Sequence, residues 1–305
     1  MPSPIQGLMA ALLTPRSHDG EVDLETLERS ADFAVSRGAQ GIVPCGGTGE
    51  YFDIPMERRQ EMAERLAGFA RGRCELVVGV GAARISESIQ LGRHALESGA
   101  AAVLLPSPYF YRYSETDLMH FFREAARAIG GPVLLYNLAG FLSPIGAGAA
   151  VELVRSEPHI VGIKDSSGTL DILRRLTSDG IDCVRIQGHD ARLPESFREG
   201  LLDCAVSGPA CVVPEMSAAM FETFGDDAAF AQAARFNDEF LQQFAHFPYP
   251  WALKWIAGWR GICRPSLPFR LSPEREQAKR EFRAWFDAWL DRLQRWRKQP
   301  ERRGA

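Results

Sequence analysis

The feature of this sequence that most constrains its fold is a succession of eight short apolar runs separated by amphipathic segments. The runs are apolar along their whole length rather than at every second position, which is typical of parallel strands covered on both faces. In chain order they are Gly7–Pro15, Gly41–Gly46, Glu75–Gly81, Ala101–Pro106, Pro132–Asn137, Ile160–Ser166, Cys183–Gly188 and Cys204–Gly208. Such runs, each followed by turn residues, indicate an α/β protein.

The segments between the runs have the signals of helices. In Asp23–Arg37, Asp23 can cap the helix N-terminus and Gly38 follows its end. Pro55–Arg71, Ser86–Ser98 and Ser114–Ile129 show the same pattern. Strands that alternate with helices eight times predict a (β/α)8 TIM barrel. A doubly wound open sheet is the alternative, but it calls for a glycine-rich phosphate turn after the first strand, and the sequence TPRSHDG there lacks one.

The strand-like runs stop at about residue 210, and helical patterns follow. These helices are expected at Glu215–Phe224, Asp227–Phe247, Trp251–Trp259 and Pro273–Arg297. We interpret the first as the helix that completes the barrel and the others as a C-terminal helical extension packed on it. The chain therefore divides into a catalytic barrel domain over residues 1–224 and a C-terminal helical region over residues 225–305.

Charge and composition exclude several classes of function. A net charge of −4 and a pI near 5.9 do not favour nucleic-acid binding. The N-terminal stretch MPSPIQGLMAALLTP has neither the basic region of a signal peptide nor an apolar run that could span a membrane. The six cysteines form no CxxC pair, and we expect buried free thiols in a cytoplasmic protein. The basic end from Arg292 reads as a solvated helix end that frays rather than a phosphate-binding tail.

Lys164 lies inside the sixth apolar run, although burying an ammonium group is costly. The chain has 35 lysines and arginines but only four lysines, so Lys164 is not an ordinary surface charge. Catalytic groups of a TIM barrel come from the C-terminal ends of strands, where Lys164 is expected. An amine that loses its proton in a dry pocket can attack a carbonyl carbon. A core lysine that snorkels or pairs with Asp165 is the structural alternative.

Other strand ends carry groups suited to the same chemistry. Tyr136 ends the fifth run, and its phenol can shuttle protons during imine formation, unless it only caps the barrel core. The sequence GGTGE at residues 46–50 combines bare amides with the Thr48 hydroxyl, which favours a carboxylate site over a simple tight turn. The pair His189-Asp190 is a weak metal signal, because no second histidine clusters with it. We expect no metal and no cofactor, and a hydrogen bond at the surface or at the pocket rim for this pair.

Five motifs together resemble the dihydrodipicolinate synthase / N-acetylneuraminate lyase family of Schiff-base (β/α)8 enzymes. They are GGTGE (46–50), LLPSPYFY (104–111), LLYN (134–137), GIKDSSG (162–168) and AVSGPACVVPE (205–215), in matching order along the whole chain. The resemblance implies an imine between Lys164 and pyruvate or another 2-oxo acid, with Tyr136 as acid and base. It implies carboxylate recognition by Thr48 and the amides of Gly47 and Thr48. It also implies further contacts at Gly188 and Ser207, and a homotetramer.

The sequence departs from that family at three places. Gly47 stands where a threonine or serine is usual, and Phe110 stands where the family has a relay tyrosine that a neighbouring subunit often supplies. Tyr109 and Tyr111 flank Phe110 and are candidates for the pocket or relay. Phe141 occupies the place of the arginine with which the synthase holds a second carboxylate, so the dihydrodipicolinate synthase reaction is disfavoured. The apolar stretch at residues 138–142 favours a substrate with an uncharged distal end.

The resulting prediction is a lyase that cleaves or condenses a 2-oxo-3-deoxy sugar acid, with pyruvate as product or donor. The alternatives within the family are a hydro-lyase similar to 5-dehydro-4-deoxyglucarate dehydratases and, less favoured, the synthase. A protein that binds a 2-oxo acid without turning it over is the non-enzymatic alternative. The few histidines disfavour a metal-dependent barrel lyase.

Overall fold

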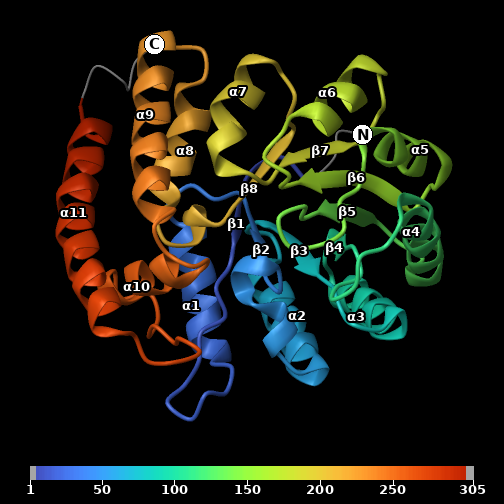
Figure 1. Ribbon diagram of the computed structural model, residues 1–305, viewed down its shortest axis with the longest axis horizontal. Coiled ribbons are helices and arrows are strands. Elements are labelled where there is room, and N and C mark those ends of the chain that lie inside the picture. The colour runs from blue at the N-terminus through green and yellow to red at the C-terminus, as the bar shows by residue number, and fades with distance from the viewer. Residues whose placement is uncertain (1–4, 300–305) are drawn as a thin grey trace.

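The computed structural model describes residues 5–299, and its eight strands form one closed parallel barrel (Figure 1). The strands are β1 (Gly7–Ala11), β2 (Gly41–Val43), β3 (Glu75–Gly79), β4 (Ala102–Pro106), β5 (Val133–Asn137), β6 (Ile160–Asp165), β7 (Val184–Gln187) and β8 (Cys204–Ser207). Each pairs with its neighbours in sequence, and β8 pairs with β1. The predicted TIM barrel is therefore confirmed, and the open-sheet alternative is wrong.

A helix follows each strand around the outside of the barrel; the first seven connect successive strands, and the eighth follows β8. They are α1 (Leu24–Val35), α2 (Met56–Ala70), α3 (Ile85–Ser98), α4 (Glu115–Ile129), α5 (Ala147–Ser156), α6 (Asp171–Ser178), α7 (Leu193–Arg198) and α8 (Pro214–Thr223). The expected cap of α1 is present, because the Asp23 side chain accepts a hydrogen bond from the Thr26 amide. Ser114 and Asp117 cap α4 reciprocally, which fixes where the chain turns back after β4.

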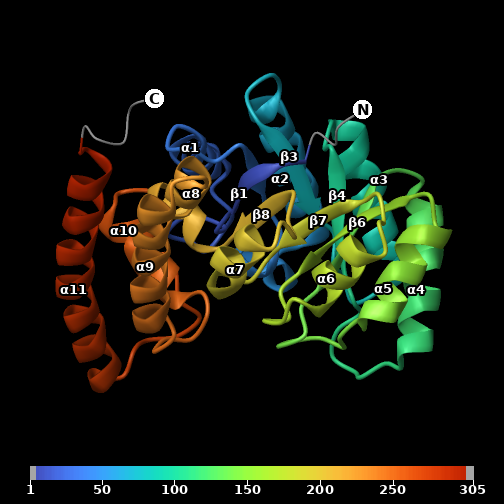
Figure 2. The ribbon, with the colours of Figure 1, turned by 90° about the horizontal axis from the view of Figure 1, so that it is seen from above.

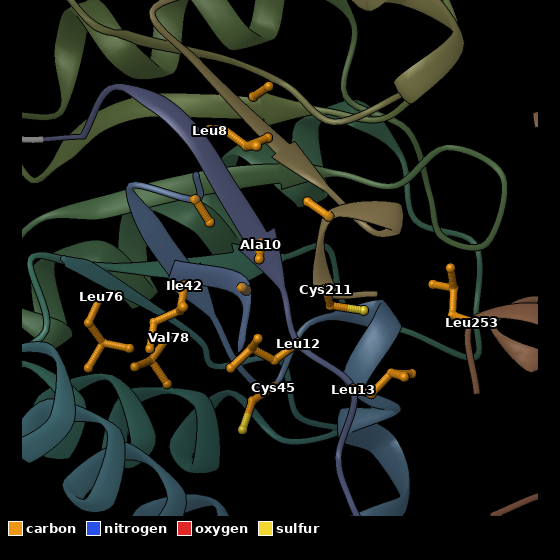
Figure 3. Packing of buried hydrophobic residues seen from close by; sticks show 14 of the residues in the cluster. Leu8, Ala10, Leu12, Leu13, Ile42, Cys45, Leu76, Val78, Cys211 and Leu253 are labelled. Carbon is orange, nitrogen blue, oxygen red and sulfur yellow. The ribbon is translucent and has the colours of Figure 1, made fainter. Parts of the chain in front are cut away.

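Side chains alternate between the barrel interior and the layer beneath the helices. On β1, Met9 and Ala11 belong to the cluster inside the barrel, whereas Leu8 and Ala10 belong to the larger cluster between strands and helices. Figure 3 shows part of this larger cluster, in which Leu8 and Ala10 lie near side chains of neighbouring strands. The same alternation places Tyr136 in the interior cluster. The Tyr136 side chain therefore lies inside the barrel, at the C-terminal end of β5.

The predicted helical extension consists of α9 (Asp227–Phe244), α10 (Trp251–Trp259) and α11 (Pro273–Arg297). Figure 2 shows α9 and α10 between the barrel and α11, which forms the outermost layer. Phe240, Trp255 and Trp289 are buried in the same cluster as the barrel's outer side chains. The boundary expected after residue 224 falls in the loop between α8 and α9. The extension thus shares its core with the barrel.

The free cysteines and the basic C-terminal end differ in part from expectation. Cys45, Cys204 and Cys211 are buried, but Cys74, Cys183 and Cys263 are only half-buried, because they lie near element ends, and none of the six forms a disulfide. Helix α11 continues to Arg297, whose guanidinium pairs with Glu222. The basic end is thus helical to that residue, and residues 300–305 lie outside the described part. No helix within residues 5–299 is long and apolar enough to cross a membrane.

Candidate active site

Lys164 and Tyr136 meet at the C-terminal ends of two adjacent strands. Tyr136 on β5 is the register partner of Lys164 on β6, and both side chains are almost fully buried. The Lys164 Nζ atom lies 4.1 Å from the centroid of the Tyr136 ring. Neighbouring positions on parallel strands that face the same way are close enough for their side chains to touch. The barrel therefore places an amine and a phenol in one small volume.

Lys164 has no carboxylate partner among the described residues, although its neighbour in sequence is Asp165. The Asp165 carboxylate instead accepts hydrogen bonds from Asn137 Nδ2 at 2.8 Å and from the Ser167 amide at 3.0 Å. The structural alternative of a Lys164–Asp165 pair is therefore wrong. A buried amine that forms no ion pair is costly for stability alone, which is typical of a functional group.

Gly188 makes room for this lysine. It follows β7, next to β6, and a Cβ atom at this position would lie only 2.7 Å from Lys164 Cε. Its carbonyl oxygen accepts a hydrogen bond from Ser166 Oγ at 3.0 Å. Any larger residue would displace the Lys164 side chain, since packed interiors tolerate little added volume. The glycine therefore gives the lysine its path into the barrel.

The turn after β2 brings Thr48 to the same end of the barrel. Residues Gly47–Gly49 form a single 3-10 turn, in which Thr48 is buried. A Cβ atom at Gly47 would lie 3.7 Å from the Tyr136 hydroxyl, an ordinary contact distance. The Thr48 hydroxyl oxygen lies 2.5 Å from the hydroxyl oxygen of Tyr249, in the loop between α9 and α10. The site thus includes a phenol that the sequence motifs did not indicate.

These groups line a cavity of about 740 Å³ at the C-terminal ends of the strands. Its polar groups include Lys164, Tyr136, Thr48, Tyr249, His189 and Asp190. Much of the remaining wall is apolar or aromatic. It includes Phe52, Tyr109, Leu138, Phe141 and Leu142 from the barrel loops, and Leu241, Phe244 and Phe247 from the extension. No arginine lines this cavity among residues 5–299.

Three of the residues considered for the site lie away from the cavity wall. The Ser207 hydroxyl is buried within 3.3 Å of the Ser217 hydroxyl and accepts from the Ala210 amide. Phe110 is 90% exposed with a positive φ of 84°, and Tyr111 is 69% exposed. In the single chain, therefore, only Tyr109 of this aromatic stretch reaches the cavity.

Asp190 lines the cavity, whereas the sequence predicted only a surface or pocket-rim hydrogen bond for the His189-Asp190 pair. Burial raises the pKa of its carboxyl to about 6, partly opposed by the Ser207 hydroxyl and the charge of Lys164. Its Oδ1 atom is buried without a hydrogen bond among the described residues. Partial burial and the Arg192 guanidinium lower the pKa of the adjacent His189. Such a carboxyl can hold a substrate hydroxyl, because it gains a partner that it otherwise lacks.

The described residues contain no group of three or more histidine, cysteine, aspartate or glutamate side chains that could hold a metal ion. His189 and Asp190 thus have no third ligand near them. The chemistry that these residues can perform is that of an amine, tyrosine phenols, a threonine hydroxyl, an imidazole and carboxyl groups around one cavity.

Comparisons with known proteins show which proteins this chain resembles. The family model described as "Dihydrodipicolinate synthetase family" matches residues 4–288. A 4-hydroxy-tetrahydrodipicolinate synthase from Alcanivorax borkumensis is 31% identical over 281 residues, covering 92% of this chain and 96% of the relative. The pyruvate complex of the Acinetobacter baumannii dihydrodipicolinate synthase is 26% identical with a TM-score of 0.85, covering 93% of this chain and 99% of that one. A sialic acid aldolase from Ruminococcus gnavus, 19% identical, has the same fold with a TM-score of 0.85 over 95% of this chain and 99% of its own.

Proposed function

Because the chain belongs to the dihydrodipicolinate synthetase family and is a lyase of the aldolase or synthase type, we propose that it acts on a 2-oxo acid through an imine on Lys164. The preferred substrate is a 2-oxo-3-deoxy sugar acid, which it cleaves to pyruvate and an aldehyde or forms in the reverse direction. The observation that carries this proposal is the buried Lys164 amine, which lacks a carboxylate partner and lies against Tyr136 in the cavity.

The proposed chemistry begins when the neutral amine of Lys164 attacks the C2 keto carbon and water leaves. Tyr136 donates the proton with which the water leaves and becomes a phenolate. The protonated imine then accepts the electron pair of the C3–C4 bond as that bond breaks, while the C4 hydroxyl gives its proton to the Tyr136 phenolate. The aldehyde departs, C3 of the enamine takes a proton back, and water hydrolyses the imine to release pyruvate. Tyr136 is the proton carrier in both directions because its ring lies beside the amine.

The ends of the cavity support a substrate with one carboxylate. Thr48 and its turn bind the carboxylate next to the keto carbon, since hydroxyl and bare amides favour an anion. Asp190 and His189 are placed for hydroxyls of the sugar chain. The wall at Leu138, Phe141 and Leu142 offers no cation to a second carboxylate, which favours an uncharged distal end.

Two alternatives share the first intermediate. A dehydratase would remove a C3 proton from the same imine and expel a hydroxyl, with the same roles for Lys164 and Tyr136. The synthase reaction named for the Alcanivorax borkumensis relative is favoured by similarity along the chain, but the cavity lacks an arginine for its second carboxylate. Product analysis with 2-oxo-3-deoxy sugar acids distinguishes the aldolase, because only the aldolase yields pyruvate.

The deciding experiment is borohydride reduction of the protein with pyruvate, followed by peptide mass mapping. We expect a pyruvate-derived adduct on the peptide of Lys164, no adduct on the peptide of the buried Lys254, and no trapping by a folded Lys164→Ala variant. Wild-type protein that traps nothing, an adduct elsewhere, or full activity of Lys164→Ala would each contradict the proposal.

We also propose that the protein forms a homotetramer and that it works in a reducing, cytoplasmic environment. The tetramer is supported by the exposed aromatic side chains Phe110 and Tyr111, which follow Tyr109 in sequence and are suited to burial between subunits. The six free thiols support the compartment. Light scattering on the purified protein measures the subunit number directly.

A further inference from the structure

We propose that Tyr249, from the loop between α9 and α10, is a positioning residue that orients the Thr48 hydroxyl toward the carboxylate of the 2-oxo acid. The inference rests on the proposed function of the cavity and names a residue from outside the barrel. Thr48 and Tyr249 are 201 positions apart in sequence, and their hydroxyl oxygens are 2.5 Å apart in the structure.

One ring contact and a neighbouring glycine define the position of Tyr249. Its ring contacts Phe244 edge-on, with ring centroids 5.7 Å apart. A Cβ atom at Gly208, after β8, would lie 2.6 Å from the Tyr249 hydroxyl and 3.5 Å from Thr48 Oγ1. Only a glycine at 208 therefore leaves room for the two hydroxyls to meet. The ring remains partly exposed on its other side, so the phenol enters the cavity from the extension.

Either hydroxyl of this pair can be the donor, and only one of the two directions leaves the Thr48 proton free for a ligand. Burial raises the pKa of the Tyr249 phenol well above its ordinary value, so the phenol keeps its proton at neutral pH. The Thr48 hydroxyl has one proton to donate and can also accept. When Tyr249 donates to Thr48 Oγ1, the Thr48 proton is free to point at an anion in the cavity. The pair thus converts a rotating hydroxyl into a donor of fixed direction, which is the form that binds a carboxylate.

The turn after β2 needs this support because Thr48 is its only hydroxyl. Gly46, Gly47 and Gly49 surround Thr48 and have no side chains to restrain it. Within residues 5–299, Thr48 Oγ1 forms a hydrogen bond with no hydroxyl or carboxylate other than the Tyr249 hydroxyl. Tyr249 is therefore the partner that sets its orientation.

The test compares wild type with Tyr249→Phe, which keeps the ring and removes the hydroxyl. The measured quantity is the concentration of ketone that gives half-maximal borohydride trapping, with pyruvate and with neutral hydroxyacetone. We expect about a tenfold increase for pyruvate and no change for hydroxyacetone, because only pyruvate has a carboxylate. Thr48→Val should show the same selectivity, and adding Tyr249→Phe to it should have no further effect. Tyr113→Phe, a tyrosine outside the cavity wall, is the matched control.

The possible outcomes distinguish a failure of the role of Tyr249 from a failure of the proposed function. Equal weakening for both ketones, additive effects in the double variant, or unchanged pyruvate trapping would overturn the role of Tyr249 alone. Failure of the wild type to trap either ketone would overturn the proposed function and this inference with it. A thermal midpoint of Tyr249→Phe within a few degrees of wild type shows that the trapping reports on binding and not on unfolding.

Discussion

The charged form of the Asp190 carboxyl destabilises the folded protein at neutral pH, because the carboxyl is buried at the cavity. Its pKa of about 6, raised mainly by burial, means that the folded state binds the proton more tightly than the unfolded state. Its contribution to stability is therefore fully present below the ordinary pKa of 3.8 and is lost as the pH rises through 6. We expect Asp190→Asn, which has no charge to desolvate, to be more stable than wild type by about 2 kcal/mol at pH 8.

Urea unfolding of both proteins at pH 8 and pH 4 checks this expectation, and the difference should nearly disappear at pH 4. The same variant should bind a hydroxylated sugar acid more weakly while it still forms the pyruvate imine. A stability difference that is equal at both pH values would show that burial of the Asp190 charge is not its cause.

The sequence predicted some of the site at this scale and missed the rest for a physical reason. Lys164 and Tyr136 end adjacent strands, and a barrel brings adjacent strand ends together whatever the loops do. The burial of Asp190 depends instead on α9, from which Asn237 Nδ2 donates to the Asp190 carbonyl oxygen at 3.1 Å. Where a distant helix docks is a tertiary property, so a local motif does not reveal it.

At the scale of elements, one buried ion pair joins the turn after β2 to helix α10. Lys254 Nζ lies 2.5 Å from Glu50 Oε2, and both side chains are largely buried. Glu50 is in the left-handed region with a φ of 51°, a conformation that its surroundings must hold. We expect Lys254→Met to destabilise the protein by about 3–5 kcal/mol, because it leaves the Glu50 carboxylate buried without a partner.

The double variant Lys254→Met with Glu50→Gln is the matched control for this prediction. It removes both charges, and it should recover most of the stability lost in the single variant, as measured by urea unfolding. If the single variant lost less than about 1 kcal/mol, solvent rather than Lys254 would be stabilising the Glu50 carboxylate.

This pair also shows why strands and helices were easier to predict than their assembly. The limits of β6 and α1 follow from an apolar run and from the Asp23 cap, both of which are local. The contacts of Lys254 with Glu50 and of Tyr249 with Thr48 join residues about 200 positions apart. They follow from the packing of aromatic surfaces between α9, α10 and the barrel, for which the sequence offers many arrangements.

At the scale of the whole molecule, the extension and the barrel behave as one unit in two respects. Their apolar side chains form one buried cluster, which includes Phe240 and Trp255 beside Leu8 and Leu12. The extension also reaches the candidate site through Asn237, Tyr249 and Lys254. Removing residues 225–305 would therefore expose a large apolar face of the barrel and take away part of the cavity wall.

The molecule provides separate probes for the two regions. All six tryptophans lie in α10 and α11, so tryptophan fluorescence reports on the extension. The buried thiols Cys45, Cys204 and Cys211 belong to the barrel or to the turns beside it, so their reaction with a thiol reagent reports on barrel opening.

We expect both probes to give the same urea midpoint, since a shared core couples the two regions into one cooperative transition. A fragment of residues 1–224 should then fail to trap pyruvate. If fluorescence instead changed at a lower urea concentration than thiol exposure, the extension would unfold as an independent unit. In that case the fragment would retain Lys164 chemistry but lose the contribution of Tyr249, and its trapping of pyruvate should resemble that of Tyr249→Phe.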